Sequence, residues 1–257
     1  MKAVILAGGL GTRLSEETVL KPKPMVEIGG RPILWHIMKI FAAQGVNDFV
    51  VCCGYKGYHI KEYFSNYYLH ASDVTFDLAD NRMEVLQSEA EPWRVTLMDT
   101  GQNSGTGGRL LRVREQIGDE AFFMTYGDGV ANVDVNALLA FHREQGNLAT
   151  LTAVQPPGRF GAFSLSKDAT RIEHFREKPK GDGAWMNGGF FALEPGVLDY
   201  IEHEGIFWEA EPLSRLAEAG ELSAYKHDGF WYAMDTLRDR NVLEAQWADG
   251  SAPWKIW

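Results

Sequence analysis

Cysteine is almost missing from this chain of 257 residues, because its only two cysteines are the adjacent Cys52 and Cys53. Adjacent cysteines provide neither a disulfide framework nor the spaced ligands of a zinc site. The seven histidines also lack metal-ligand spacing. A reducing, cytoplasmic setting is therefore the default expectation.

Long apolar runs and an excess of positive charge are missing too. No apolar stretch approaches the roughly 18 residues that a membrane helix needs, and the apolar run at residues 3–6 is too short for a signal peptide. The net charge of −10 argues against nucleic acid as a partner. Without a Pro- or Ser-rich linker, a single domain is predicted, with a first half of about 1–155 and a second of about 156–257.

The first half alternates between short apolar segments and amphipathic ones. The predicted strands are 3–6, 49–53, 96–99, 122–126 and 149–154, and the predicted helices are 33–43, 60–68, 109–117 and 135–145. This alternation predicts an α/β fold, with a mostly parallel sheet and helices on both of its faces. In the second half, 162–166 and 171–176 are predicted to be antiparallel strands. They are followed by strands at 188–193 and 222–226 and helices at 212–219 and 237–248.

A glycine cluster, LAGGLGTRL at residues 6–14, follows the first predicted strand. It is not the dinucleotide fingerprint, because Leu14 stands where a third glycine is needed. It is not a Walker loop either, because Gly11 is followed by Thr12-Arg13 and not by Lys-Ser/Thr. Its bare amides and the guanidinium group of Arg13 suit phosphate oxygens. A tight strand-to-helix turn with a surface arginine stays an alternative.

The segment Lys21-Pro22-Lys23-Pro24 cannot be helical inside its proline run and is stiffened by it. One of its ammonium groups could reach the phosphates bound by the glycine cluster. The alternative is a solvated loop.

Two aspartates each follow an apolar run, Asp128 after 122–126 and Asp235 after 231–234. In parallel α/β sheets, ligands bind at the carboxyl ends of the strands, where Asp128 is expected. Mg²⁺ prefers one or two carboxylates plus substrate phosphates. Alternatively, Asp235 or Thr236 simply caps the helix at 237–248. Together with the glycine cluster, Arg13 and Lys23, the two aspartates form a set suited to phosphoryl transfer.

Two further features lie in the second half. Glu177 and Lys178, followed by Asn187, would suit a hydroxylated and phosphorylated ligand, although 173–178 could equally be an exposed edge strand. Five of the eight tryptophans lie between Trp208 and Trp257. They predict a C-terminal segment that docks by burying aromatic rings, with a contact between subunits of a homo-oligomer as one possibility.

With these residues in view, the chain resembles the sugar-1-phosphate nucleotidyltransferases. The stretches that carry the resemblance run from residue 3 to APWK near the end: LAGGLGTRLSEET, KPKPMVEIGGRPILWHIM, CCGYKGYHIKEYF, TGGRL, YGDGV, PPGRFGAF, EKPKGDGAWMNGGFF and MDTLRD. GGxGTR with a downstream PKP is specific to this family, and SEET after GTRL fits its cytidylyl branch.

The resemblance implies a Rossmann-like mixed sheet of the nucleotide-diphospho-sugar transferase type, with a smaller mixed-sheet part that binds the sugar. It also implies Mg²⁺-dependent transfer of a cytidylyl group from CTP to glucose 1-phosphate, with release of pyrophosphate. A uridylyl- or thymidylyltransferase and a non-catalytic, nucleotide-binding regulatory relative stay open as alternatives.

The resemblance further implies a role for each matching residue. Catalysis would rest on Arg13, Lys23 and Asp128, and Asp128 and Asp235 would hold the metal. The sugar phosphate would be bound by Gly161, Glu177, Lys178 and Asn187. The nucleotide would be bound by Leu6, Ala7, Gly8, Gly9, Leu10, Gly11, Thr12, Arg13, Lys23, Ser104, Thr106, Gly108, Arg109 and Asp128. The loop at 101–109 is expected to read cytosine, with Arg109 or nearby backbone directed at O2 and N3 of the base.

Overall fold

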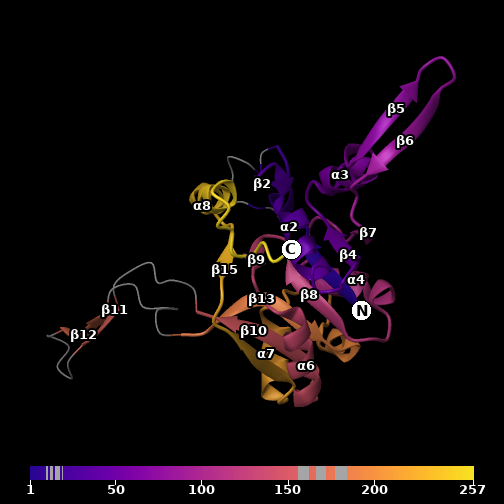
Figure 1. The fold of residues 1–257 in the computed structure, drawn as a ribbon. Coiled ribbons are helices and arrows are strands. Elements are labelled where there is room, and N and C mark those ends of the chain that lie inside the picture. The colour runs from indigo at the N-terminus through magenta and orange to yellow at the C-terminus, as the bar shows by residue number, and fades with distance from the viewer. Residues whose placement is uncertain are drawn as a thin grey trace.

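A computed structural model of the chain describes residues 1–9, 11, 14, 18, 20–155, 162–165, 172–176 and 184–257. Its centre is a seven-stranded sheet with the order β14-β10-β13-β8-β1-β4-β7 (Figure 1). The strands are β1 (Lys2–Ala7), β4 (Asp48–Cys53), β7 (Arg94–Asp99), β8 (Phe122–Tyr126), β10 (Ala149–Val154), β13 (Met186–Leu193) and β14 (Leu222–His227). All five strands predicted in the first half are confirmed.

The sheet is mixed but mostly parallel, as predicted. β1 pairs in parallel with β4 and β8, and β4 pairs in parallel with β7. β13 is antiparallel to both of its neighbours, β8 and β10, whereas β10 and β14 run parallel. The carboxyl ends of β1, β4, β7 and β8 consequently meet at one edge of the sheet, where ligands bind in folds of this kind.

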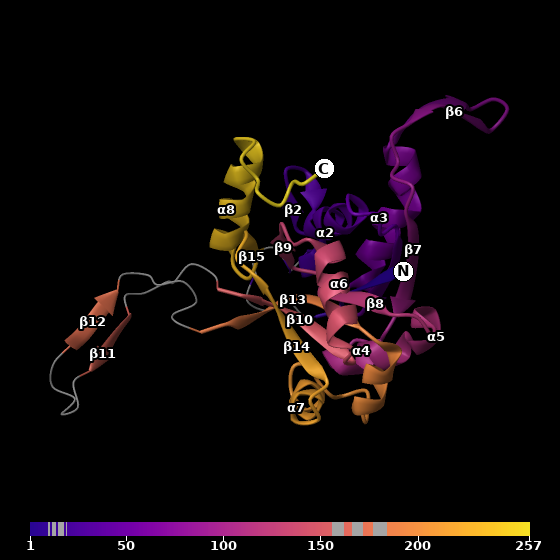
Figure 2. The same ribbon diagram turned by 60° about the horizontal axis from the view of Figure 1, so that its bottom comes forward.

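Alternation along the strands separates two hydrophobic cores. In β1, Ala3 and Ile5 face one core, while Val4 and Leu6 face the other. The first core lies under α2 (Ile33–Ala42) and α6 (Val135–Gln145), and Figure 2 shows α6 across this face of the sheet. The second core lies under α4 (Thr106–Arg112), α5 (Arg114–Ile117) and α7 (Glu211–Glu218). Helices therefore cover both faces, which confirms the predicted class.

The single helix predicted at 109–117 is wrong in its bounds. The helical segment begins at Thr106 and is divided into α4 and α5 at Val113. The backbone of Val113 leaves the helical conformation, with φ −109° and ψ 14°, and its side chain is fully buried in the second core. Packing of this β-branched residue thus ends the first helix, which the apolar periodicity alone could not show.

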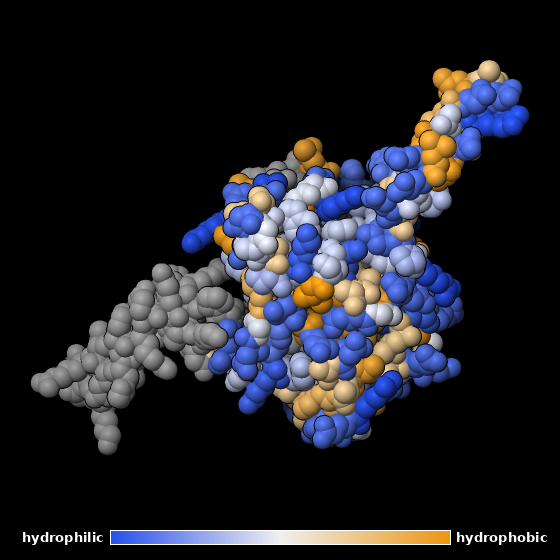
Figure 3. All heavy atoms as spheres, in the orientation of Figure 1, coloured by the Kyte–Doolittle hydropathy of each residue, from blue (hydrophilic) through white to orange (hydrophobic). Residues whose placement is uncertain are grey.

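A β-hairpin that the sequence did not predict follows α3 (Gly57–His70). Its strands, β5 (Ser72–Asp77) and β6 (Arg82–Ser88), extend away from the sheet (Figure 1). Most of its side chains are exposed on both faces, so the alternation that marks a half-buried strand is missing. Apolar side chains nevertheless lie on its surface (Figure 3), namely Phe76, Leu78, Met83 and Leu86.

Short strand pairs and the C-terminal helix complete the described fold. β11 (Ala162–Leu165) and β12 (Ile172–Arg176) pair antiparallel, as predicted. β9 (Gly129–Ala131) pairs with β15 (Trp231–Ala233), and β2 (Glu27–Ile28) pairs with β3 (Arg31–Pro32). α8 (Leu237–Ala248) has the predicted bounds.

The C-terminal tryptophans dock onto the chain's own α2. Trp254 is fully buried, and its ring stacks on that of Trp247. Trp257 makes an edge-to-face contact with Trp35 of α2. The predicted docking is therefore confirmed within one chain. No helix in the part of the chain that the structure describes is long and apolar enough to cross a membrane.

Candidate active site

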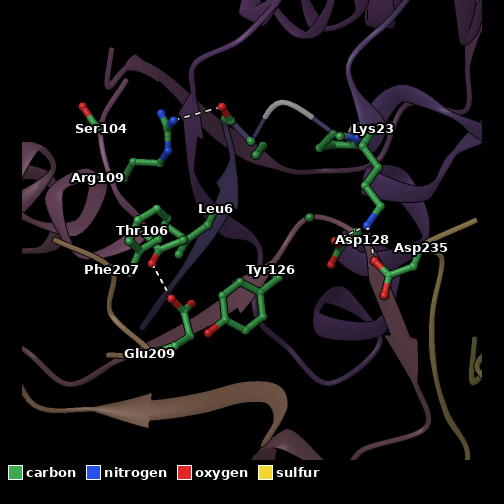
Figure 4. Close-up of a pocket in the computed structure, with 16 residues that line it drawn as sticks. Leu6, Lys23, Ser104, Thr106, Arg109, Tyr126, Asp128, Phe207, Glu209 and Asp235 are labelled. Atoms are coloured by element: carbon green, nitrogen blue, oxygen red, sulfur yellow. Dashed lines mark hydrogen bonds and ion pairs between the residues drawn. The ribbon is translucent and has the colours of Figure 1, made fainter. Parts of the chain in front are cut away.

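A cleft of about 630 Å³ lies at the carboxyl ends of β1 and β8 (Figure 4). Its size is typical of a small-molecule site. Most of the predicted nucleotide and metal residues that the structure describes line it. The lining consists of Leu6, Ala7, Gly8, Gly9, Gly11, Lys23, Pro24, Ser104, Thr106, Arg109, Tyr126, Gly127, Asp128, Phe207, Glu209 and Asp235.

Lys23 joins the two predicted metal carboxylates. Its Nζ donates to Oδ2 of Asp128 at 2.6 Å and to Oδ1 of Asp235 at 2.7 Å. Burial disfavours the charged ammonium group, but the two carboxylates outweigh this effect and raise the pKa of Lys23 above its ordinary value. Lys23 is therefore a fixed positive charge, and the two carboxylates converge on one point.

A short strand ladder brings the two aspartates together. Asp128 occupies the turn between β8 and β9, and β9 pairs with β15, which ends just before Asp235. The amide of Met234 also donates to the carbonyl of Asp128 at 2.9 Å. Backbone pairing thus brings together two aspartates that lie far apart in the chain.

The start of α8 settles the alternative role of Asp235. Thr236 is the N-cap, and its hydroxyl accepts from the amide of Asp239. The carboxylate of Asp239 in turn accepts from the amides of Thr236 at 2.8 Å and Asp235 at 3.2 Å, which completes a capping box. Because Thr236 and Asp239 cap the helix, the carboxylate of Asp235 is available to bind Lys23.

The proline-rich segment is part of the cleft rather than a solvated loop. Lys23 begins a short 3-10 helix (Lys23–Met25) in which Pro24 is buried. Pro24 packs against Gly127, where a Cβ would lie 2.9 Å from Cγ of Pro24. Lys21 is directed elsewhere, since its Nζ bonds to Glu27 at 2.7 Å.

The glycine cluster is held from behind by Arg109. Nη2 of Arg109 donates to the carbonyl of Gly8 at 2.9 Å, and a Cβ on Gly8 would lie 2.2 Å from Nη1. Gly11 has a φ of +65°, the left-handed region that favours glycine. The predicted phosphate ligands Leu10, Thr12 and Arg13 lie outside the described residues, and their roles stay predictions.

Arg109 does not point to solvent. Only 3% of the residue is exposed, and burial lowers the pKa of its guanidinium group. Nη1 donates to Oγ1 of Thr100 at 2.8 Å and to the carbonyl of Gly101 at 2.7 Å. Arg109 therefore ties the predicted base loop to the glycine cluster, while its direct contact with a base stays a prediction.

A smaller pocket of about 190 Å³ adjoins the cleft. Three residues, Tyr126, Asp128 and Asp235, line both cavities. The predicted sugar residue Asn187 lines the smaller one, and its Oδ1 accepts from the amide of Gly189 at 2.8 Å. The other predicted sugar residues, Gly161, Glu177 and Lys178, lie outside the described residues, so their roles stay predictions.

Several lining residues were missed by the sequence reasoning. Tyr126 directly precedes the Gly127-Asp128 turn and could have been included on that ground. Phe207 and Glu209 gave no signal, because their segment, IFWEAEP, reads as an ordinary acidic stretch before a helix. Gly108 lies beneath the backbone of Glu204, and its predicted contact with the nucleotide stays a prediction.

The fold is that of a nucleotidyltransferase. A sequence description of the nucleotidyl transferase family matches residues 2–245, and the chain belongs to that family. The chain is 63% identical to the glucose-1-phosphate cytidylyltransferase of Salmonella typhi, over 100% of both chains. It is 44% identical to a probable glucose-1-phosphate cytidylyltransferase of Bacillus subtilis (strain 168), again over 100% of both.

Solved structures confirm the fold. The crystal structure of HddC from Yersinia pseudotuberculosis aligns with a TM-score of 0.70 at 22% sequence identity. The alignment covers 96% of this chain and 99% of that one. At this level of identity the likeness concerns the fold alone.

Proposed function

We propose that this protein transfers a cytidylyl group from CTP to glucose 1-phosphate, giving CDP-glucose and pyrophosphate. The observation that carries the proposal is the Lys23–Asp128–Asp235 cluster, in which both aspartates line the cleft and the adjoining pocket. A charged cluster at the junction of two cavities is what a transfer between two phosphorylated substrates requires. The 63% identity to a glucose-1-phosphate cytidylyltransferase supports the choice of substrates.

The obstacle to this reaction is the repulsion between two polyanions. A phosphate oxygen of glucose 1-phosphate attacks the α-phosphorus of CTP in line, and pyrophosphate leaves on the opposite side. The attacking oxygen is already ionised at neutral pH, so no general base is needed. Lys23, together with Arg13 and Lys178 in their predicted places, offsets the repulsion, and catalysis consists of positioning and charge stabilisation.

The two aspartates fit a divalent metal ion, which enzymes of this family generally use. Their carboxylates converge on Nζ of Lys23, and their side chains are 33% and 34% exposed, so hydrated ions can reach them. We propose Mg²⁺, because it prefers one or two carboxylates together with substrate phosphates. When bound, the ion would neutralise developing charge on the reacting phosphates.

The nucleotide would lie along the cleft. The triphosphate would be held by the glycine cluster, with the α-phosphate beside Lys23 and Asp128. The base would lie toward the loop at 101–109. Since the guanidinium of Arg109 already bonds to Gly8, Thr100 and Gly101, the backbone of this loop is the better placed reader of cytosine. Glucose 1-phosphate would occupy the adjoining pocket with Asn187.

A substrate panel tests this function. Four nucleoside triphosphates are combined with several sugar 1-phosphates, with and without Mg²⁺, and pyrophosphate release is measured. CTP with glucose 1-phosphate is expected to be the best pair. A preference for UTP or dTTP would make the protein a uridylyl- or thymidylyltransferase. Binding of CTP without pyrophosphate release from any pair would make it a regulatory relative.

A further inference from the structure

Backbone hydrogen bonds hold the segment at 204–206, just before α7, against the start of α4. The amide of Gly105 donates to the carbonyl of Glu204 at 2.9 Å, and the amide of Gly107 donates to the carbonyl of Ile206 at 3.1 Å. A Cβ at Gly108 would lie 1.8 Å from the carbonyl oxygen of Glu204, and one at Gly105 would lie 2.1 Å from that of Ile206. The glycines of this helix start thus serve the close approach of the 204–206 backbone.

The residues that follow this segment place two side chains, Phe207 and Glu209, in the cleft. Trp208 is fully buried in the second core, whereas its neighbours Phe207 and Glu209 line the cleft. Oγ1 of Thr106 accepts from the amide of Trp208 at 2.8 Å and donates to Oε2 of Glu209 at 2.6 Å. Thr106 therefore fixes both the backbone and the carboxylate of this segment.

Glu209 faces Tyr126, the residue that belongs to both cavities (Figure 4). The hydroxyl oxygen of Tyr126 is buried next to Glu209 and Asn187. Burial, followed by the negative charge of Glu209, raises the pKa of Tyr126 above its ordinary value. Tyr126 is therefore a neutral neighbour, and the carboxylate of Glu209 lines the cleft beside a residue that also lines the adjoining pocket.

The proposed attack on the α-phosphorus of CTP gives no role to the negative charge of Glu209. The other two carboxylates of the cleft bond to Lys23, but Glu209 makes no ion pair among the described residues. A carboxylate has about four lone-pair sites, so the hydrogen bond from Thr106 leaves Glu209 able to accept another from a substrate. Hydroxyl groups of sugar rings are such donors, as in the acidic residue that binds ribose in dinucleotide sites.

We propose that Glu209 accepts a hydrogen bond from a sugar-ring hydroxyl of a bound substrate and thereby selects that substrate. The hydroxyl belongs either to the ribose of the nucleotide or to the hexose of the sugar phosphate, since Tyr126 borders both cavities. The exocyclic amine of cytosine is the competing donor, and the ratio of activity with CTP to activity with UTP distinguishes it from a ring hydroxyl. This inference rests on the proposed function.

Deoxy substrates test the assignment. The value of kcat/KM is measured for CTP, 2′-deoxy-CTP and 3′-deoxy-CTP with glucose 1-phosphate, and for CTP with 4-deoxy- and 6-deoxyglucose 1-phosphate. The wild type is expected to lose roughly tenfold to a hundredfold with one of these analogues, the size expected for a hydrogen bond to a charged acceptor. In Glu209→Ala that penalty is expected to vanish, and the ring concerned identifies the partner.

Two variants control for indirect effects. Glu211→Ala removes the same charge from an exposed position two residues along the chain and is expected to keep every penalty of the wild type. Glu209→Gln keeps the shape of the side chain and a carbonyl oxygen for Thr106, and is expected to reduce the penalty only in part.

Three outcomes would overturn the proposal. Deoxy penalties that are equal in wild type and Glu209→Ala would show that Glu209 contacts no ring hydroxyl. A changed CTP-to-UTP ratio with unchanged deoxy penalties would assign the carboxylate to the base amine instead. A wild type that is inactive with every triphosphate and sugar phosphate would refute the proposed function, and this proposal with it.

Discussion

At the scale of single residues, Lys23 is the centre of the site. It bonds to aspartates that lie 105 and 212 positions further along the chain. The position of its ammonium group between two carboxylates explains how the proposed metal-binding site can be held together before substrates arrive. The substitution of either aspartate leaves Lys23 paired with the other one.

Asp128→Asn and Asp235→Asn are each expected to lower kcat by roughly a hundredfold or more, because a metal ligand stabilises transition-state charge by several kcal/mol. Pyrophosphate release at saturating substrates measures the effect. Asp119→Asn, at an exposed position, should change neither activity nor melting temperature. If Asp235→Asn turned over at a normal rate, Asp235 would have no part in holding the metal.

Arg109 presents a second test at this scale. If loss of its side chain loosens the loop that reads the base, Arg109→Ala should lower the ratio of kcat/KM for CTP over that for UTP. It should also weaken the binding of both nucleotides, because the carbonyl of Gly8 loses its donor. Steady-state kinetics with the two nucleotides measure this ratio. An unchanged ratio with lower activity would limit Arg109 to supporting the glycine cluster.

His36 makes the stability of the fold depend on pH. It is fully buried, its Nε2 donates to the carbonyl of Ile28 at 2.8 Å, and its Nδ1 accepts from Nε1 of Trp254 at 3.4 Å. Both bonds suit the neutral ring, and burial lowers the pKa of His36 to about 4. The unfolded chain takes up this proton below about pH 6.5, whereas the folded chain resists it until about pH 4. Stability is therefore lost as the pH falls through this window.

Between pH 7 and pH 4, His36 is expected to lower the free energy of unfolding by about 3 kcal/mol. Denaturant unfolding of wild type and His36→Gln at both pH values measures the contribution of His36 to the free energy of unfolding. The variant should lose less stability on acidification than the wild type. His203→Gln, at an exposed histidine, should behave as the wild type does. Equal acid losses in all three proteins would contradict the assignment.

At the scale of elements, the start of α8 links helix capping to the site. Asp239 is 4% exposed, and its carboxylate accepts from the amides of both Asp235 and Thr236. Asp239 is thus expected to be a positioning residue, which acts on the proposed metal site through the backbone of Asp235. The strand pair β9–β15 places the same residue from the other side.

Asp239→Ala is expected to raise the Mg²⁺ concentration needed for half-maximal activity and to lower stability by about 1 kcal/mol, the usual value of a lost cap. Titration of activity with Mg²⁺, alongside thermal unfolding, measures both effects. Asp134→Ala is the matched control, because Asp134 is the N-cap of α6, away from the cleft. It should lose similar stability with an unchanged Mg²⁺ requirement. A shift in that requirement in the control as well would mean that stability alone is responsible.

At the scale of the whole molecule, the β5–β6 hairpin carries exposed apolar side chains. It extends beyond the two cores, and its Leu78 and Leu86 side chains are 89% and 64% exposed. Since the C-terminal tryptophans pack within their own chain, they no longer provide the surface for the predicted homo-oligomer. The hairpin is the better place for such a contact, because exposed apolar patches mark interaction surfaces.

Leu78→Ser combined with Leu86→Ser is therefore expected to yield a smaller assembly than the wild type while the fold is retained. Light scattering coupled to gel filtration measures the mass, and circular dichroism monitors the fold. Ile256→Ser replaces an exposed apolar residue outside the hairpin and should leave the mass unchanged. A monomeric wild type would contradict the predicted oligomer itself.

Much of the fold could be predicted because its signals are local. The alternation within β1 and β4 and the glycine after α6 depend on neighbours in the chain, and α6, α8, β8 and β10 have the predicted bounds. The β5–β6 hairpin could not be predicted in this way, since its strands bury neither face. The break at Val113 depends on a core built from distant strands.

The sequence by itself determined the class of fold, the glycine cluster, and the lysine and aspartates that belong together in one chemistry. It could do so because residue type and position relative to a strand or helix end are properties of short stretches of chain. Only the tertiary structure decided which groups meet. The ladder of β9 and β15 brings Asp235 to Lys23, burial turns Arg109 toward the carbonyl of Gly8, and the glycines of α4 admit the segment that carries Glu209. These contacts join residues far apart in the chain, and the order of strands in the sheet, which no local pattern encodes, places them together.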